Sequence, residues 1–427
     1  MSAPGPEVHS KARQAGVNFV FVTVALDMVA FGLALPVLPL LITQMAGGDD
    51  AHGAVVYGVF GTVWAALQFL CSPVLGAVSD NIGRRPVLLF SNFALGIQYV
   101  ILALAPGLAI LLLGRIISGI ASASVTTANA YIADVTPPDK RAAAFGLMGA
   151  AFGVGFVLGP ALGGLLGDVN PRLPFWCAAV ASFAAGFYGL FILPESLPKD
   201  RRSPIQWRKA NPVGALTFLR EKTGVAPLAF AKFFSDLAHV VLPSTFVLYA
   251  AHRFEWGPKE VGLTLGVVGV LSIVVQAGLV GRVVRWIGAE KALMLGLGAG
   301  VIAFVVYGLA SEPWMLFVGV AFGSVYGFAG AATQTLLTQR VSPKEQGRLQ
   351  GALGGLTGLA TLFGPAIFTG TLATFIADGA VVWLPGAAFL LAALFLVVSG
   401  ILAWIAITDR NAPAIAAVSP IPDEPLS

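Results

Sequence analysis

The chain has 427 residues, of which 57% are hydrophobic and only 11% are charged, and its mean hydropathy is +0.85. Soluble domains carry about 45–50% apolar and about 25% charged residues, so this composition excludes an ordinary soluble domain and indicates a polytopic membrane protein. Both cysteines, Cys71 and Cys177, lie in apolar runs, which predicts neither a disulfide framework nor a metal site. The net charge of +4 alone would allow a nucleic-acid partner.

Each membrane-spanning helix needs about 20 mostly apolar residues. Such stretches follow one another along the whole chain, at 17–41, 54–77, 87–105, 107–132, 142–167, 173–193, 225–250, 260–284, 290–310, 313–338, 347–376 and 380–407. They predict an all-α membrane protein with twelve transmembrane helices. The first stretch has no small-residue cleavage site, so we expect a retained helix. The stretch 409–427, rich in Ala and Pro, is expected to be disordered.

The basic residues fall almost entirely on one side of this alternating path. The other side receives only Arg172, Arg253 and Lys259. Loops rich in Lys and Arg stay in the cytoplasm, so we expect the basic side and both termini to be cytoplasmic. The basic excess is therefore a topology signal, and we expect no nucleic-acid partner. The basic side carries Lys11, Arg13, Arg84, Arg85, Lys140, Arg141, the segment Lys199–Lys222, Arg282, Arg285, Lys291, Arg340, Lys344, Arg348 and Arg410.

One long polar break, 194–224, divides the chain into two sets of six helices. We predict an N-terminal bundle over 1–193, a cytoplasmic linker over 194–224 and a C-terminal bundle over 225–408. The halves repeat landmarks at a spacing of about 205 residues. Two parallel six-helix repeats are typical of secondary transporters that bind substrate between the halves. The repeated landmarks are Gly83 with Gly288, Gly114 with Gly319, Pro138 with Pro343, and Gly159-Pro160 with Gly364-Pro365.

The connection between the second and third stretches, Gly76–Pro86, carries the most specific motif. Gly83 allows a turn with positive φ, and Pro86 suits the first turn of a helix. Asp80 could accept hydrogen bonds from a helix N-terminus or pair with Arg84 or Arg85. The alternative is a basic turn that only sets topology. The pattern G-x-x-x-D-x-x-G-R-R resembles the signature between helices 2 and 3 of the major facilitator superfamily. That resemblance implies a cytoplasmic gate made of Asp80, Gly83, Arg84, Arg85 and Asp134.

The fifth stretch is unusually rich in glycine. Small residues at four-residue spacing let helix backbones approach closely, and proline loosens the helix locally. The alternative is ordinary tight packing. The pattern resembles the helix 5 signature of the antiporter branch of the superfamily, which implies a packed seam where the halves hinge, and export by exchange. The hinge residues are Gly146, Gly155, Gly159, Pro160, Gly163 and Gly164.

Four charged residues fall inside apolar stretches, where each costs about 2.5–3.5 kcal/mol near the centre of the bilayer. Asp27 and Arg115 belong to the first half, and Lys232 and Asp236 lie four residues apart on one face of a helix in the second. The structural alternatives are a self-neutralised Lys232–Asp236 pair and an interhelical Asp27–Arg115 salt bridge. The functional interpretation is that a carboxylate in the interior binds and releases one proton per cycle.

Neutral polar residues in the spans supply candidate substrate contacts. Most such groups only hydrogen-bond to neighbouring helices, which is the alternative for each of them. A single histidine could titrate near neutrality. The candidates are Gln68, Gln98, Asn129, His239, Gln276 and Gln334.

Taken together, the motifs resemble those of the tetracycline–proton antiporters over almost all of residues 17–408. The resemblance rests on the stretches Leu26–Pro39, Ser79–Leu89, Leu113–Gly119 and Glu345–Gly351. The resemblance implies that Asp27 and Arg115 take part in proton coupling or in substrate binding. Three positions depart from the family, because Gln98, Ser272 and Gly300 stand where it has titratable or drug-contacting groups. These departures weaken tetracycline itself as the expected substrate.

The sequence therefore predicts a proton-coupled efflux antiporter that exports a drug-like amphipathic compound by alternating access, a tetracycline-type drug being one candidate. The alternative is an exporter of a small metabolite such as a sugar or osmolyte. A receptor or embedded enzyme is disfavoured, because no nucleotide loop or nucleophile–base arrangement is present. We expect no cofactor and no metal, the proton gradient as the energy source, and a monomer in the bacterial inner membrane. The expected partners are the small-molecule substrate, protons and the lipid bilayer.

Overall fold

The structure is a computed structural model that describes residues 21–122, 124–137, 140–204, 217–221, 224–342 and 345–409. Within these ranges the chain is helical and contains no strand. The predicted disorder of the C-terminal tail and the basic residues Lys11 and Arg13 fall almost wholly outside the described residues. So do Pro138 and Pro343, one of the four repeated landmarks.

Eleven described helices are long and apolar enough to cross a membrane, and α5 is a shorter apolar helix. The prediction of twelve transmembrane helices is confirmed, because α5 and α6 together take the place of the fourth. The first span, Phe21–Met45, ends in α2 (Leu38–Met45). The other elements of the first half are α3 (Asp50–Ile82), α4 (Arg84–Leu104), α5 (Leu108–Ala121), α6 (Ser124–Val135), α7 (Arg141–Val169) and α8 (Leu173–Ile192).

The second half repeats this order. Two short elements, η2 (Lys199–Arg201) and α9 (Thr217–Glu221), come first. The seventh span joins α10 (Ala226–His239) to α11 (Val241–Phe254). The eighth contains α12 (Pro258–Ile273), the π-helical segment η4 (Val274–Val280) and α13 (Gly281–Ile287). The remaining four are α14 (Ala289–Leu309), α15 (Pro313–Gln339), α16 (Gln346–Ile376) and α17 (Ala387–Thr408).

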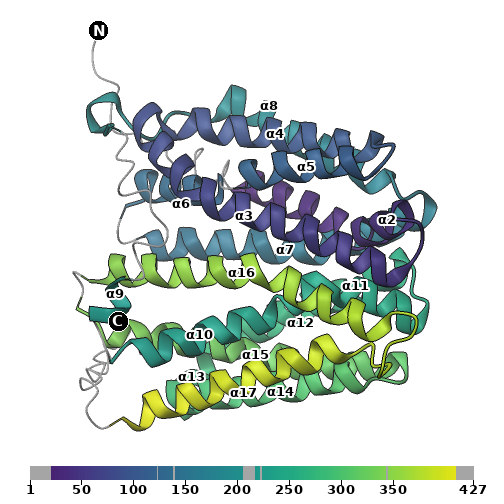
Figure 1. Ribbon diagram of the computed structural model, residues 1–427. Helices are drawn as coiled ribbons and strands as arrows, with labels where there is room; N and C mark the ends of the chain where they lie inside the picture. The colour runs from purple at the N-terminus through teal and green to yellow at the C-terminus, as the bar shows by residue number, and fades with distance from the viewer. Residues whose placement is uncertain are drawn as a thin grey trace.

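The helices run roughly parallel to one another, with those of the first half in the upper part of the view and those of the second half in the lower part (Figure 1). The largest hydrophobic cluster consists almost wholly of residues after 217, whereas two smaller clusters belong to residues before 194. Contacts between the halves come mainly from α7 on α12 and from α3 on α16. The exact domain boundaries at 193 and 225 stay a prediction.

Gly83 is the whole connection between α3 and α4. The stretch Gly76–Pro86, expected to be a loop, is instead two helix ends, because α3 continues to Ile82 and α4 begins at Arg84. Gly83 has φ 114° and ψ 161°, which confirms the predicted positive φ. Gly288 joins α13 to α14 with φ 84° and ψ 158°, so the repeat seen in the sequence is also a repeat of backbone conformation.

The first and seventh spans are interrupted at matching points. The first turns at residues 35–37, just before α2, and the seventh is broken at Val240. These two breaks are separated by about the same 205 residues as the other landmarks. Interrupted membrane helices free backbone groups, and such breaks are tolerated where protein or water can satisfy those groups. Functional groups are therefore expected near these two breaks.

Replacing Gly83 by alanine should destabilise the protein more than the same change at Gly288. Both glycines adopt a backbone region that costs other residues about 1–3 kcal/mol. A Cβ at Gly83 would also meet the Glu195 carboxylate and Arg202, whereas one at Gly288 would meet nothing within 4 Å. Thermal unfolding of the two purified variants measures the difference. Equal losses of apparent Tm would show that the Glu195 contact adds nothing.

Candidate functional site

Arg84 organises a cluster of charges at the end of the bundle that carries Gly83, which we call the basic end. Its Nη1 lies 2.5 Å from Asp80 Oδ1 and donates to Ser79 Oγ at 2.6 Å. Its Nε lies 3.2 Å from Asp134 Oδ2, at the end of α6. The Arg84 side chain is only 11% exposed, so these interactions are partly shielded from water. The expected approach of Asp134 to the motif is therefore present.

Glu195 is a member of this cluster that the sequence analysis missed. It lies just after α8, and its two carboxylate oxygens accept the backbone N–H groups of Arg84 at 2.9 Å and Arg85 at 3.3 Å. A helix N-terminus has unpaired N–H groups and a partial positive charge, so a carboxylate there is favourable. Arg202 lies 3.9 Å from the same carboxylate. The Arg85 side chain donates to the carbonyl of Leu190 at 2.7 Å. The cluster thus ties together α3, α4, α6 and the segment after α8.

Asp27 and Arg115 lie within one helical bundle but do not form the salt bridge considered from the sequence. Asp27 Oδ1 and Arg115 Nε are buried, and neither has a hydrogen-bond partner among the described residues. The Arg115 guanidinium instead stacks over Trp64, 5.2 Å from the ring centroid, and the Trp64 indole donates to Ser118 Oγ at 3.2 Å. Tyr99 lies within electrostatic reach of both charges. Tyr99 is therefore a neighbour common to the acid and the base, and one polar atom of each stays without a hydrogen-bond partner among the described residues.

Lys232 and Asp236 do form the predicted pair, with Lys232 Nζ 2.6 Å from Asp236 Oδ2. Thr357 of α16 donates to the same Asp236 oxygen at 2.6 Å. One turn further along α10, His239 stacks on Tyr326 with ring centroids 5.3 Å apart and an interplanar angle of 16°. The pair and the stacked rings lie just before the break of the seventh span, so the second half has its own polar region.

The other predicted cavity residues are spread over several helices. Gln98 is 2% exposed on α4, and its Oε1 has no partner among the described residues. Gln276 lies on η4, and π-helical turns inside α-helices frequently mark functional sites. Gln68 on α3 and Gln334 on α15 are half-buried, and Asn129 on α6 is exposed. Tyr57, which was not predicted, reaches across the halves and donates to the carbonyl of Pro243 at 3.2 Å.

The glycines of α7 make close contacts with two different helices, the first span and α12. A Cβ at Gly155, Gly159 or Gly163 would collide with the first span, at Met28, Gly32 and Leu33 respectively. A Cβ at Gly164 would collide with Gly262 of α12, in the other half. Gly159 leaves room for Gly32 beside Pro160. Gly146, in contrast, meets nothing within 4 Å and is outside this seam. The seam thus joins the first span, α7 and α12.

The chain matches the family model of the Major Facilitator Superfamily over residues 20–365 and again over 228–425. It is 40% identical over 373 residues to the tetracycline resistance protein, class C, of Escherichia coli, which covers 87% of this chain and 93% of that protein. It is also 29% identical over 360 residues to the hippocampus abundant transcript 1 protein of Homo sapiens, covering 82% of this chain and 72% of that one.

Solved structures of transporters have the same fold. The human organic anion transporter MFSD10 superposes with a TM-score of 0.69 at 24% identity, covering 92% of this chain and 99% of that one. A bacterial homologue of the human lysosomal transporter Spinster, in an inward-facing and unoccupied conformation, superposes with a TM-score of 0.74 at 16% identity, covering 95% and 98%. This chain belongs to the Major Facilitator Superfamily, resembles its tetracycline resistance proteins, and is a multi-pass membrane transporter.

The variant Glu195→Gln should loosen the basic end. The amide keeps the shape of the side chain but removes the negative charge at the N-terminus of α4, an interaction worth about 0.3–1 kcal/mol or more. We expect a lower apparent Tm and faster hydrogen exchange at Arg84 and Arg85. The matched control is Asp200→Asn, an exposed acid in the neighbouring η2 element. If both variants behave like the parent, the Glu195 contact does not stabilise this end.

Proposed function

We propose that this member of the Major Facilitator Superfamily is a proton-coupled exporter that exchanges external protons for a cytoplasmic amphipathic compound. The observation that carries the proposal is the Asp27 carboxyl oxygen, which is buried in the first half without a hydrogen-bond partner among the described residues, as is Arg115 Nε in the same half. An unpaired charge inside the membrane is costly, and a carboxyl group avoids that cost by binding a proton. Asp27 is therefore our choice for the proton-binding residue of the first half.

Arg115 supplies the competition that exchange requires. When Asp27 is protonated, the guanidinium keeps its stacking contact with Trp64. When the proton leaves, the carboxylate becomes an acceptor for a cation, and Arg115 and a cationic or polar substrate group compete for it. Binding of the substrate and binding of the proton then exclude one another, which is the condition for antiport.

The second half provides a complementary region. Lys232 and Asp236 neutralise each other, and Thr357 adds a hydrogen bond to the same carboxylate oxygen. The stacked His239 and Tyr326 rings offer a flat aromatic surface next to the pair. A substrate with a planar apolar body and a few polar groups would suit both halves. Asp236 is the second candidate for proton binding.

The candidate substrates are a tetracycline-type drug, another amphipathic drug and a small metabolite. The tetracycline resistance proteins support a tetracycline-type drug. Against it, a Cβ at Gly300 would already press on Tyr326 and Leu396, so this position has no room for an acidic side chain. Gln98 is neutral as well. These two observations favour other amphipathic drugs, and they keep an exporter of a small metabolite as the second candidate.

The charge distribution supports one orientation of the protein in the membrane. The basic end carries Arg84 and Arg85, and the positive-inside rule places it in the cytoplasm of a bacterial inner membrane. The Asp80–Arg84–Asp134 cluster would then act as the cytoplasmic gate. Alternating access would rock the two halves along the α7–α12 and α3–α16 contacts. We expect the proton gradient to supply the energy without a cofactor.

Asp27→Asn should abolish coupling without unfolding the protein. Purified protein in liposomes with an imposed proton gradient and an internal pH reporter is given tetracycline with magnesium and then other amphipathic drugs. We expect substrate-triggered proton flux in the parent and its loss in the variant, because the amide cannot bind and release a proton. The control Asp168→Asn changes an exposed acid at the C-terminal end of α7, and this variant should keep the proton flux.

Each outcome of this assay changes a different part of the proposal. Flux that survives Asp27→Asn would move the coupling to Asp236. Flux with other drugs but not with tetracycline would keep the antiporter and remove the tetracycline assignment. Silence across the drug panel, with uptake of a sugar or osmolyte instead, would favour the metabolite exporter.

Asp80→Ala should slow turnover and leave substrate affinity nearly unchanged. The change removes one of the two acids on Arg84 but lies at the basic end, away from Asp27 and Asp236. Turnover numbers and equilibrium binding of the same fluorescent substrate separate the two effects. A large loss of affinity would contradict the role of Asp80 as a gate residue.

A further inference from the structure

An ion pair joins the two halves at the end of the bundle opposite the basic end, which we call the far end. Asp50, the first residue of α3, places Oδ2 2.8 Å from Nδ1 of His252, in the last turn of α11. Because α3 belongs to the first half and α11 to the second, the pair bridges the halves directly. An acid at a helix N-terminus and a protonated histidine at a helix C-terminus are each stabilised by the helix dipole.

Few other charges surround this pair. Asp49 accepts the backbone N–H of His52 as the N-cap of α3, and the His52 side chain is exposed. On α11, Arg253 stacks over Trp383 at 5.1 Å and donates to the carbonyl of Ala310, and Glu255 follows the helix. The α2 helix has no charged residue, and the far end of α16 has none before Asp378. No second acid is therefore seen on His252 among the described residues.

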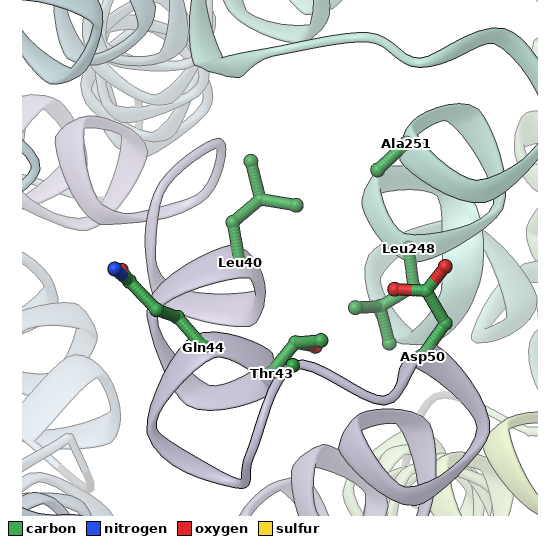
Figure 2. Close-up of a pocket in the computed structure, with 7 residues that line it drawn as sticks. Leu40, Thr43, Gln44, Asp50, Leu248 and Ala251 are labelled. Carbon is green, nitrogen blue, oxygen red and sulfur yellow. The ribbon is translucent and has the colours of Figure 1, made fainter.

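A cavity of about 240 Å³ opens beside the pair. Figure 2 shows Leu40 and Thr43 of the first half on one side of it and Leu248 and Ala251 of the second half on the other, with Asp50 beside Leu248. The Asp50 side chain is 47% exposed. Water and protons on the far side of the membrane can therefore reach the pair without passing through the bundle.

We propose that Asp50 and His252 form a second proton site, which closes the far end between the halves when His252 is protonated. Histidine is the side chain that ordinarily changes its charge between pH 5 and 8. Protonated His252 and ionised Asp50 form a charge-assisted hydrogen bond, whereas neutral His252 leaves only a weaker one. Proton binding thus favours the state in which the pair is formed, and in that state α3 and α11 are in contact across the halves at the far end.

This site gives the proposed exchange a direction, and in that respect it rests on the proposed function. With the basic end in the cytoplasm, the far end faces the outside, where the proton concentration is high under a proton gradient. A proton arriving at His252 closes the outer side and turns the binding region toward the cytoplasm. Acid outside would therefore accelerate the return of the carrier to its inward-facing state.

The test measures the opening of the far end directly. Cys71 and Cys177 are replaced by serine, and spin labels are attached at Ala109→Cys and Glu312→Cys, exposed positions near the far ends of the two halves. Double electron–electron resonance then gives the populations of short and long distances in lipid nanodiscs between pH 5 and 8. The variants are His252→Gln and Asp50→Asn, and the matched control is His52→Gln, an exposed histidine two residues from Asp50.

We expect the short-distance population of the parent to rise about threefold on acidification, as suits one half-exposed ion pair. The rise should persist in His52→Gln and disappear in both His252→Gln and Asp50→Asn. An unchanged pH response in His252→Gln, or no response in the parent, would overturn the proton site. Since distances are measured without substrate, that result leaves the flux assay free to succeed, whereas absent flux with an intact distance response would count against the proposed function alone.

Discussion

The carboxylate of Glu195 at the N-terminus of α4 is the interaction on which the basic end depends. One glycine separates α3 from α4, and the first N–H groups of α4 have no partner within their own helix, so an acceptor at this corner is favourable. Glu195 supplies it from a segment far along the chain. The corner in turn sets the position of Arg84, which holds Asp80 on one side and Asp134 on the other. A single acceptor thus fixes four segments of the first half.

Local pattern was enough to predict the twelve helices and the positive φ of Gly83, because both depend on residues close together in sequence. The Asp80–Arg84 contact joins residues four apart in sequence across the Gly83 corner, so their proximity along the chain was enough to suggest it, and the approach of Asp134 came through the family resemblance. Glu195, the Asp50–His252 bridge and the Tyr57–Pro243 contact could not be predicted in this way. Each joins segments more than a hundred residues apart, and nothing in their own neighbourhoods identifies the partner. The Asp27–Arg115 salt bridge, considered from the sequence as an alternative, is not formed, and the Arg115 guanidinium lies over Trp64 instead.

The two halves share a backbone plan but differ in charge. The position equivalent to Asp27, about 205 residues later, is Lys232, so an acid in the first half corresponds to a base in the second. The two side chains have different surroundings, because Lys232 has a counter-ion one turn away whereas Asp27 has none within the described ranges. Gly288 likewise repeats the corner of Gly83 without an acidic side chain close against it. The proposed proton chemistry of the first half and the proposed aromatic surface of the second follow from this asymmetry.

The π-helical segment η4 has a consequence for how the eighth span can evolve and move. A π turn holds about one residue more than an α turn, and one extra residue rotates everything beyond it by about 100°. The α12 part, whose glycines fit α7, and the α13 part, which carries Arg282 and Arg285, are therefore set in register separately. The π-helical segment between them sets the rotation of α13 about the helix axis relative to α12. Loss of one residue there would leave the seam with α7 in place while turning the basic residues to a different side of the membrane helix.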